Sequence, residues 1–157
     1  MNIYEDLIEG IKGVLIYKIG DAEYCTDIQY IAAVKRIDEI KQNAGQNYIS
    51  QIEYNQSAFS IIDLHNIYKT NPLKQTNNIR IIMQEMFGKN FCFFADRVLE
   101  ILSTDKIFME KTMDLLPYSG KNFIKYILKY QNRDILFPDF EKITKSLYKL
   151  NEFHHMA

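Results

Sequence analysis

Apolar side chains recur at helical spacing along most of this sequence, and this periodicity limits the fold more than any other feature. From Ile3 to Leu15 the apolar residues follow the i, i+3, i+4, i+7 pattern and cover an arc of roughly 140°. Glu5, Asp6 and Glu9 fall on the opposite side of that helical wheel. Only 6 glycines and 3 prolines interrupt the 157 residues, which favours long helices over many short strands.

The same reasoning predicts a series of helices along the rest of the chain. Asn71-Pro72, Gly88 and Pro117 are clear stops, because helices end before proline and often at glycine. We expect helical segments at about 21–43, 47–70 (one broken helix or two short ones), 79–87, 91–102, 104–116, 121–132 and 138–150. The predicted fold is therefore all-α, a bundle or layered array of about eight helices.

An alternative concerns the N-terminal part of the chain. Val14–Ile19 and Glu23–Ile28 are rich in β-branched residues and flank Gly20-Asp21, a dipeptide typical of a type II′ hairpin turn. The alternative fold is α+β with a small N-terminal hairpin. The apolar arc from Ile3 to Leu15 favours the helical interpretation.

Length and composition predict one globular domain over residues 1–157. A chain of this length buries about 70% of its unfolded surface, enough for a core without disulfides. The 47% apolar and 25% charged residues exclude a disordered chain. Acidic residues stand where a secretory signal needs none, and no run approaches the ~18 apolar residues of a membrane span. We expect a cytoplasmic protein in which Cys25 and Cys92 are reduced core thiols.

The sequence lacks the common catalytic and cofactor motifs. There is no glycine-rich phosphate loop, no Gly-x-Ser-x-Gly and no His-Glu-x-x-His. His65 with Asp63, or Cys92 near a predicted helix start, would be the first residues to consider in an enzyme. His65 lies within an apolar arc and Cys92 among aromatic residues, so burial is the favoured interpretation of both. We expect no enzymatic activity, no cofactor and no metal site.

Charge is unevenly distributed along the chain. Residues 1–66 contain 10 acidic and 5 basic residues, a net charge of −5, whereas residues 67–157 contain 10 acidic and 14 basic residues, a net charge of +4. This layout predicts an electrostatic dipole despite the formal total of −1. The acidic residues that would form a negative patch are Glu5, Asp6, Glu9, Asp21, Glu23 and Asp27. Phe93, opposite the apolar arc of its predicted helix, is an exposed aromatic candidate for the same interface.

Basic residues form a second candidate surface. Lys121, Lys125, Lys129 and Arg133 are each four residues apart, so on a helix they would form one stripe. Such a stripe can follow the phosphates of a nucleic acid, and it can equally be the solvated face of an amphipathic helix.

These features favour a non-enzymatic protein-binding module. Its most concrete form is an immunity or antitoxin-type inhibitor, whose acidic surface neutralises a basic toxin or nuclease and speeds association by charge. The alternative is a nucleic-acid-binding or regulatory protein that uses the basic stripe, and an enzyme with an unrecognised site is a third hypothesis. The oligomeric state stays open.

Overall fold

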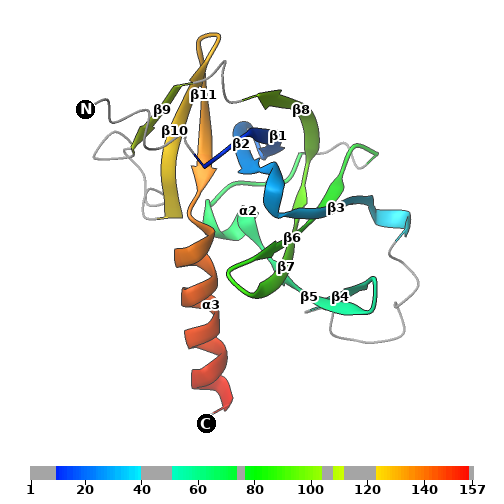
Figure 1. The fold of residues 1–157 in the computed structure, drawn as a ribbon. Coiled ribbons are helices and arrows are strands. Elements are labelled where there is room, and N and C mark those ends of the chain that lie inside the picture. The colour runs from blue at the N-terminus through cyan, green and yellow to red at the C-terminus, as the bar shows by residue number, and fades with distance from the viewer. Residues whose placement is uncertain (1–9, 40–50, 74–76, 104–107, 112–122, 156–157) are drawn as a thin grey trace.

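Short strands joined by tight turns make up most of the chain (Figure 1). The structure is a computed structural model, and it describes residues 10–39, 51–73, 77–103, 108–111 and 123–155. The strands are β1 Gly13–Ile19, β2 Ala22–Asp27, β3 Ile31–Arg36, β4 Gln51–Tyr54, β5 Ser57–Ile62, β6 Arg80–Met86, β7 Lys89–Ala95, β8 Arg97–Ser103, β9 Phe108–Lys111, β10 Ile124–Tyr130 and β11 Arg133–Pro138. The helical elements are the 3-10 turn η1 Ile28–Tyr30, the one-turn α2 Leu64–Ile67 and the longer α3 Phe140–His155.

The described strands form two sheets. Sheet A has six strands in the order β8-β1-β2-β11-β10-β9, and sheet B has five in the order β3-β6-β7-β5-β4. The chain leaves sheet A through η1, builds sheet B, and returns to sheet A at Asp96, between β7 and β8. Most neighbours are antiparallel, whereas β2 with β11 and β5 with β7 are parallel.

The all-α prediction is wrong, and burial explains why. In β1, Val14 and Ile16 face one apolar cluster while Leu15 and Tyr17 face another, so both faces of the strand are buried. A strand buried on both faces is a continuous apolar run, which fits helical spacing as well as strand spacing. In such a run the alternation that identifies a strand disappears.

Two of the expected elements are present. The alternative hairpin is closer to the structure, because β1 and β2 pair antiparallel around Gly20-Asp21. Near the C-terminus, the expected helix at 138–150 corresponds to α3. Residues 1–9, 104–107 and 112–122 lie outside the described residues. The described parts of the helices predicted at 3–15 and 104–116 are strands instead, in β1 and β9.

Three apolar clusters hold the sheets. One packs on the face of sheet A that is turned away from sheet B, and its buried members are Val14, Ile16, Cys25, Leu102, Leu128, Ile135 and Phe137. Another packs on the face of sheet B that is turned away from sheet A, with buried members Ile52, Phe59, Ile81, Met83 and Cys92. The third and largest lies between the sheets, where the rings of Phe91 and Phe93 contact Phe140 at the start of α3, with centroids 5.1 and 5.5 Å away. We call it the shared layer.

Sheet B curls so that its two outer strands approach each other. Lys35 on β3 lies over the ring of Tyr54 on β4, with its Nζ 5.3 Å from the ring centroid. These strands stand at opposite ends of the strand order, so the contact brings the ends of the sheet together. The apolar cluster that contains Ile52, Met83 and Cys92 is therefore enclosed by the strands of sheet B.

Candidate protein interface

An isoleucine from η1 packs over the first residue of β1. Gly13 has no side chain, and a Cβ built there would lie 2.9 Å from Ile28 Cδ1 and 3.3 Å from the carbonyl oxygen of Leu102. The missing side chain therefore makes room for Ile28 against the β1–β8 pair. Ile28 still remains 38% exposed.

Ile101 lies on the same side of sheet A. The antiparallel register places Ile101 opposite Leu15 and Ser103 opposite Gly13, and opposed residues share a face. Among the described strands β8 is an outer strand of sheet A, and the side chain of Ile101 is 66% exposed.

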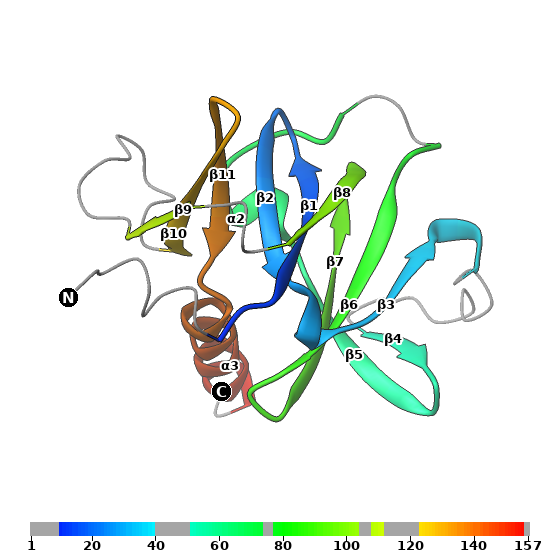
Figure 2. The ribbon, with the colours of Figure 1, turned by 45° about the horizontal axis from the view of Figure 1, so that its top comes forward.

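Val34 adds an exposed apolar residue on sheet B. It lies on the outer strand β3, opposite the fully buried Ile82 of the shared layer, and it is 40% exposed. η1 is the direct link from sheet A to β3, so Ile28 stands where the chain passes from one sheet to the other, and β3 follows it (Figure 2). We call Ile28, Val34 and Ile101 the apolar strip.

The apolar strip is notable for how much exposed apolar surface it gathers. Among the described residues four large hydrophobic side chains are exposed, and the strip contains three of them; the fourth is Phe87. Single exposed apolar residues are common, whereas apolar residues that gather on a surface are typical of a protein contact site.

A buried carboxylate lies at the end of β1 opposite to Gly13 and Ile28. Asp96 accepts hydrogen bonds from the backbone N–H of Gly20 at 2.6 Å and of Leu73 at 3.0 Å, and its Oδ2 lies 2.7 Å from His65 Nε2. Its own N–H donates to the carbonyl of Lys18 at 2.9 Å. Asp96 therefore ties the β1–β2 turn of sheet A to the segment that follows α2.

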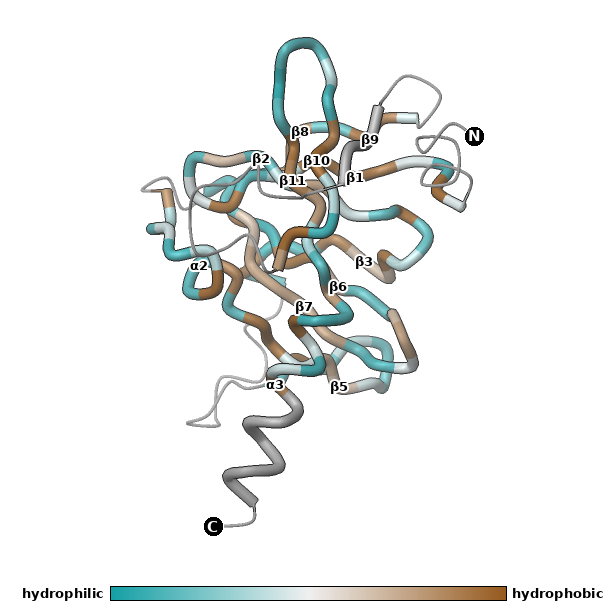
Figure 3. Tube along the Cα trace, turned by 90° about the vertical axis from the view of Figure 1, so that its left-hand side faces the viewer, coloured by the Kyte–Doolittle hydropathy of each residue, from teal (hydrophilic) through white to brown (hydrophobic). Residues whose placement is uncertain are grey.

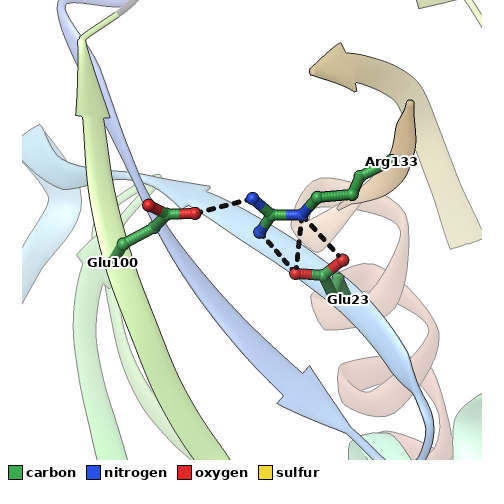
Figure 4. A network of polar contacts seen from close by, with 3 residues as sticks. All are labelled: Glu23, Glu100 and Arg133. Carbon is green, nitrogen blue, oxygen red and sulfur yellow. Dashed lines mark hydrogen bonds and ion pairs between the residues drawn. The ribbon is translucent and has the colours of Figure 1, made fainter. Parts of the chain in front are cut away.

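An ion-pair network crosses sheet A (Figure 4). The guanidinium of Arg133 on β11 donates to Glu23 on β2 and, through Nη1, to Glu100 on β8 at 2.8 Å. These hydrogen bonds, the Glu23 ones first, raise the pKa of Arg133 above its ordinary value. The network links three strands, of which β8 and β11 are not neighbours.

The predicted acidic patch is not assembled in the described part of the chain. Glu5, Asp6 and Glu9 lie outside the described residues. Asp21 is exposed in the β1–β2 turn, whereas Glu23 pairs with Arg133. Asp27 is buried and accepts from the backbone N–H of Gln29 at 3.1 Å, which caps η1. The negative charges of Glu23 and Asp27 therefore have structural partners within the chain.

Phe93 and the basic stripe also differ from expectation. Phe93 is fully buried in the shared layer, so its expected exposure is wrong. Lys121 lies outside the described residues. Lys125 and Lys129 are on strand β10 and Arg133 is on β11, so no helix arranges them as a stripe. Lys129 pairs with Asp134, and Arg133 with two glutamates.

The residues considered for catalysis either form structural hydrogen bonds or are buried in the core. Asp63 caps α2 by accepting from the N–H of Asn66, and His65 is paired with Asp96. Cys25 and Cys92 are buried, as predicted, and burial raises the pKa of the Cys92 thiol to about 12. A thiol with that pKa stays protonated at neutral pH and is a poor nucleophile.

The described residues contain neither a metal site nor a membrane-spanning helix. No group of three or more His, Cys, Asp or Glu residues there is arranged to hold a metal ion. Within the same residues, no helix has the length and apolar character needed to cross a membrane.

Two sheets around a shared apolar layer define the class: a two-sheet β fold with exposed apolar residues on η1, β3 and β8. The chain belongs to the family of CheW-like domains, whose model matches residues 13–147. A similar solved structure is the scaffolding protein TtCheW from Thermoanaerobacter tengcongensis. It is 17% identical with a TM-score of 0.64, over 82% of this chain and 88% of that chain. No curated protein matches the sequence.

Family membership corrects the functional hypothesis. The immunity or antitoxin-type inhibitor is wrong, because the chain is a CheW-like domain. The signal that sequence analysis missed was the exposure of Ile28, Val34 and Ile101. Each lies in an apolar segment, so its exposure depends on which strands end up at the edge of a sheet.

Proposed function

We propose that this chain is a non-catalytic protein-binding scaffold of chemotaxis signalling, which acts in the cytoplasm and connects chemoreceptors with CheA. Membership of the CheW-like family supports this role, and the similar solved structure is itself described as a scaffolding protein. The observation that carries the proposal is the apolar strip, because it offers a contact surface without any catalytic group.

The geometry of the strip suits a protein partner. Its residues come from β3, β8 and η1, and the capping of η1 by Asp27, which accepts from the N–H of Gln29, holds Ile28 in place before binding. A preformed apolar surface loses little conformational entropy when a partner covers it. Burying an isoleucine side chain contributes about 1.5–3 kcal/mol, so Ile101 is a suitable anchor.

Replacing Ile101 by glutamate tests the proposal. We expect the substitution to weaken binding of a chemoreceptor cytoplasmic fragment or of CheA, both from the same organism, by tenfold or more. The reason is that a charged side chain replaces an isoleucine that the bound partner would bury. Isothermal titration calorimetry measures both affinities, and thermal unfolding checks that the variant is folded.

The matched control is Gln51→Glu, which adds the same charge at an exposed position of another outer strand, β4. It should leave both affinities within twofold of the unmodified chain. If Ile101→Glu binds both proteins as the control does, the apolar strip is not the interface.

A further inference from the structure

Two arginines face each other across the β3–β6 pair of sheet B. Arg36 is the last residue of β3 and Arg80 is the first residue of β6, and the antiparallel register places them directly opposite each other. Opposed residues have Cβ atoms about 4.5–5.5 Å apart, and like charges in such a pair destabilise a sheet. Arginine stays charged at physiological pH, so this repulsion persists in the free protein.

The described residues supply no carboxylate for either guanidinium. None of their ion pairs includes Arg36 or Arg80. Nη1 of Arg80 donates to the carbonyl oxygens of Asn77 at 3.2 Å and Ile79 at 2.9 Å, which carry no charge. Arg36 donates through its backbone N–H to Glu39 Oε1 at 3.4 Å. Within the described residues, the guanidinium of Arg36 and the Nε and Nη2 of Arg80 form no hydrogen bond.

The nearby acidic side chains do not neutralise this pair. Glu39 Oε2 lies 3.5 Å from Lys35 Nζ. Asp38 is exposed beside Glu39 and takes part in no ion pair of the described part of the chain. Asp96, directly after β7, already accepts from two backbone N–H groups and contacts His65.

Arg133 shows how the chain can satisfy an arginine of a sheet internally. It follows the β10–β11 turn, which is hydrophilic at the top of Figure 3. Its guanidinium is paired with the carboxylates of Glu23 and Glu100. Arg36 and Arg80 lack such carboxylates, so their free donors are available to an acceptor from outside the chain.

The arginine pair continues the apolar strip. Val34 precedes Arg36 by two residues and lies opposite Ile82, which follows Arg80 by two residues, so these side chains share one face of the sheet. Two residues of a strand span about 7 Å at roughly 3.3 Å per residue. A protein that covers Val34 therefore also removes water from the two guanidinium groups. Removing water from a charge is costly unless the charge is paired and hydrogen-bonded.

We infer that Arg36 and Arg80 together bind one carboxylate, an aspartate or glutamate side chain of the protein that covers the apolar strip. The inference rests on the proposed function, because that function assigns the apolar strip to a protein partner. The planar guanidinium matches a carboxylate, with which it forms two parallel charge-assisted hydrogen bonds. The carbonyl contacts of Arg80 hold one of the two groups in place before binding.

A phosphate-rich occupant fits this surface less well. Residues 31–39 and 77–82 carry three basic side chains, Lys35, Arg36 and Arg80, against the two acidic side chains of Asp38 and Glu39, a net charge of +1. Anionic lipid surfaces are bound by clusters of about 4–8 basic residues. One carboxylate balances the surplus charge found here, so the charge of the site matches a single acidic side chain.

Replacing either arginine by glutamine tests the inference. Calorimetry is used with CheA and with the chemoreceptor fragment. We expect Arg36→Gln and Arg80→Gln each to weaken, by about fivefold or more, the same protein that Ile101→Glu weakens. The loss should shrink at high salt, which screens exposed charges. The unfolding midpoint of Arg36→Gln should be no lower than that of the unmodified chain, because a repulsion is removed.

Lys35→Gln is the matched control. It removes the same charge from the same strand, but Lys35 lies opposite Ile81 and so faces the other side of sheet B. Its affinity for that protein should stay within about twofold of the unmodified chain.

Carbodiimide coupling identifies the occupant, since it joins an amine to a carboxylate in contact with it. Arg36→Lys keeps the positive charge and places an amine at the site. In the complex, peptide mass spectrometry should find position 36 linked to an aspartate or glutamate of the protein that Ile101→Glu weakens. The amine of Lys35 faces away and should form no link to that protein.

The other outcomes overturn the inference in distinguishable ways. If the unmodified chain binds neither protein, or Ile101→Glu weakens neither, the proposed function fails and this inference fails with it. If Ile101→Glu weakens one protein and either glutamine variant binds it as Lys35→Gln does, only this inference fails. Weaker binding without a link from position 36 to a carboxylate of that protein also overturns it. A link to a second copy of the chain, or arginine-dependent sedimentation with phosphatidylserine vesicles, identifies a different occupant and does the same.

Discussion

At the scale of single residues, Gly20 combines two restrictions. Its φ is +63°, and a Cβ built on it would lie 2.0 Å from Thr70 Oγ1. Its N–H also donates to the buried carboxylate of Asp96. The turn therefore needs both the left-handed conformation and the absence of a side chain.

Gly20→Ala should lower the free energy of unfolding by more than about 2 kcal/mol, because strain of about 1–2 kcal/mol adds to the steric clash with Thr70. Gly88→Ala is the control, since Gly88 has φ +70° with nothing within 4 Å of its built Cβ. It should cost only about 1–2 kcal/mol, the strain alone. Urea unfolding measures both values, and equal losses would show that Thr70 does not restrict position 20.

At the scale of elements, the Arg133 network joins β2, β8 and β11. Arg133→Gln should lower the free energy of unfolding by about 1 kcal/mol, because the planar guanidinium bonds two carboxylates that are only partly exposed. The loss should shrink as salt concentration increases.

Lys145→Gln is the control for the Arg133 network. Lys145 and Glu141 form an exposed pair one turn apart on α3. Its removal should change the free energy of unfolding by at most about 0.5 kcal/mol. Denaturant unfolding at low and high salt compares the two variants. A loss for Arg133→Gln no larger than that for Lys145→Gln would mean that the network does not stabilise the sheet.

The elements also show which parts of the fold can be predicted from the sequence. The β1–β2 hairpin could be predicted because Gly20-Asp21 is a local turn signal. Helix α3 could be predicted because it follows Pro138 and has one buried face. Strand β7 could not be predicted, because both of its faces are apolar and buried. Phe91 and Phe93 face the shared layer, while Cys92 faces the other apolar cluster of sheet B. The helical wheel placed Phe93 on a polar face, whereas strand alternation buries it.

The candidate interface was harder to predict than the fold. Ile101 is exposed because β8 is an outer strand, and strand order is decided by pairings between distant segments. The pairing of Glu23 with Arg133 joins residues from the halves that the charge count separated. A charge layout along the sequence therefore does not predict a charge layout on the surface.

At the scale of the whole molecule, Asp96 connects the two sheets. Asp96→Asn should lower the free energy of unfolding by about 2–3 kcal/mol, because the amide replaces a charged acceptor that three groups share. The transition should remain a single one, since both sheets contribute to the shared layer. Tyrosine fluorescence and far-ultraviolet circular dichroism check that the two probes coincide.

Asp63→Asn is the control for Asp96, because asparagine caps a helix about as well as aspartate does. It should change the free energy of unfolding by less than about 0.5 kcal/mol. Separate transitions for the two probes in Asp96→Asn would instead mean that the sheets unfold independently.

The path of the chain between the sheets determines the order in which they can form during synthesis. Every described strand of sheet B lies in the continuous stretch from Ile31 to Ala95, so sheet B can pair as soon as that stretch has left the ribosome. Sheet A needs β1 and β2 from the beginning of the chain and β11 from near its end. The face of β1 and β2 that carries Val14, Ile16 and Cys25 therefore lacks its partners Ile135 and Phe137 until translation has passed Pro138.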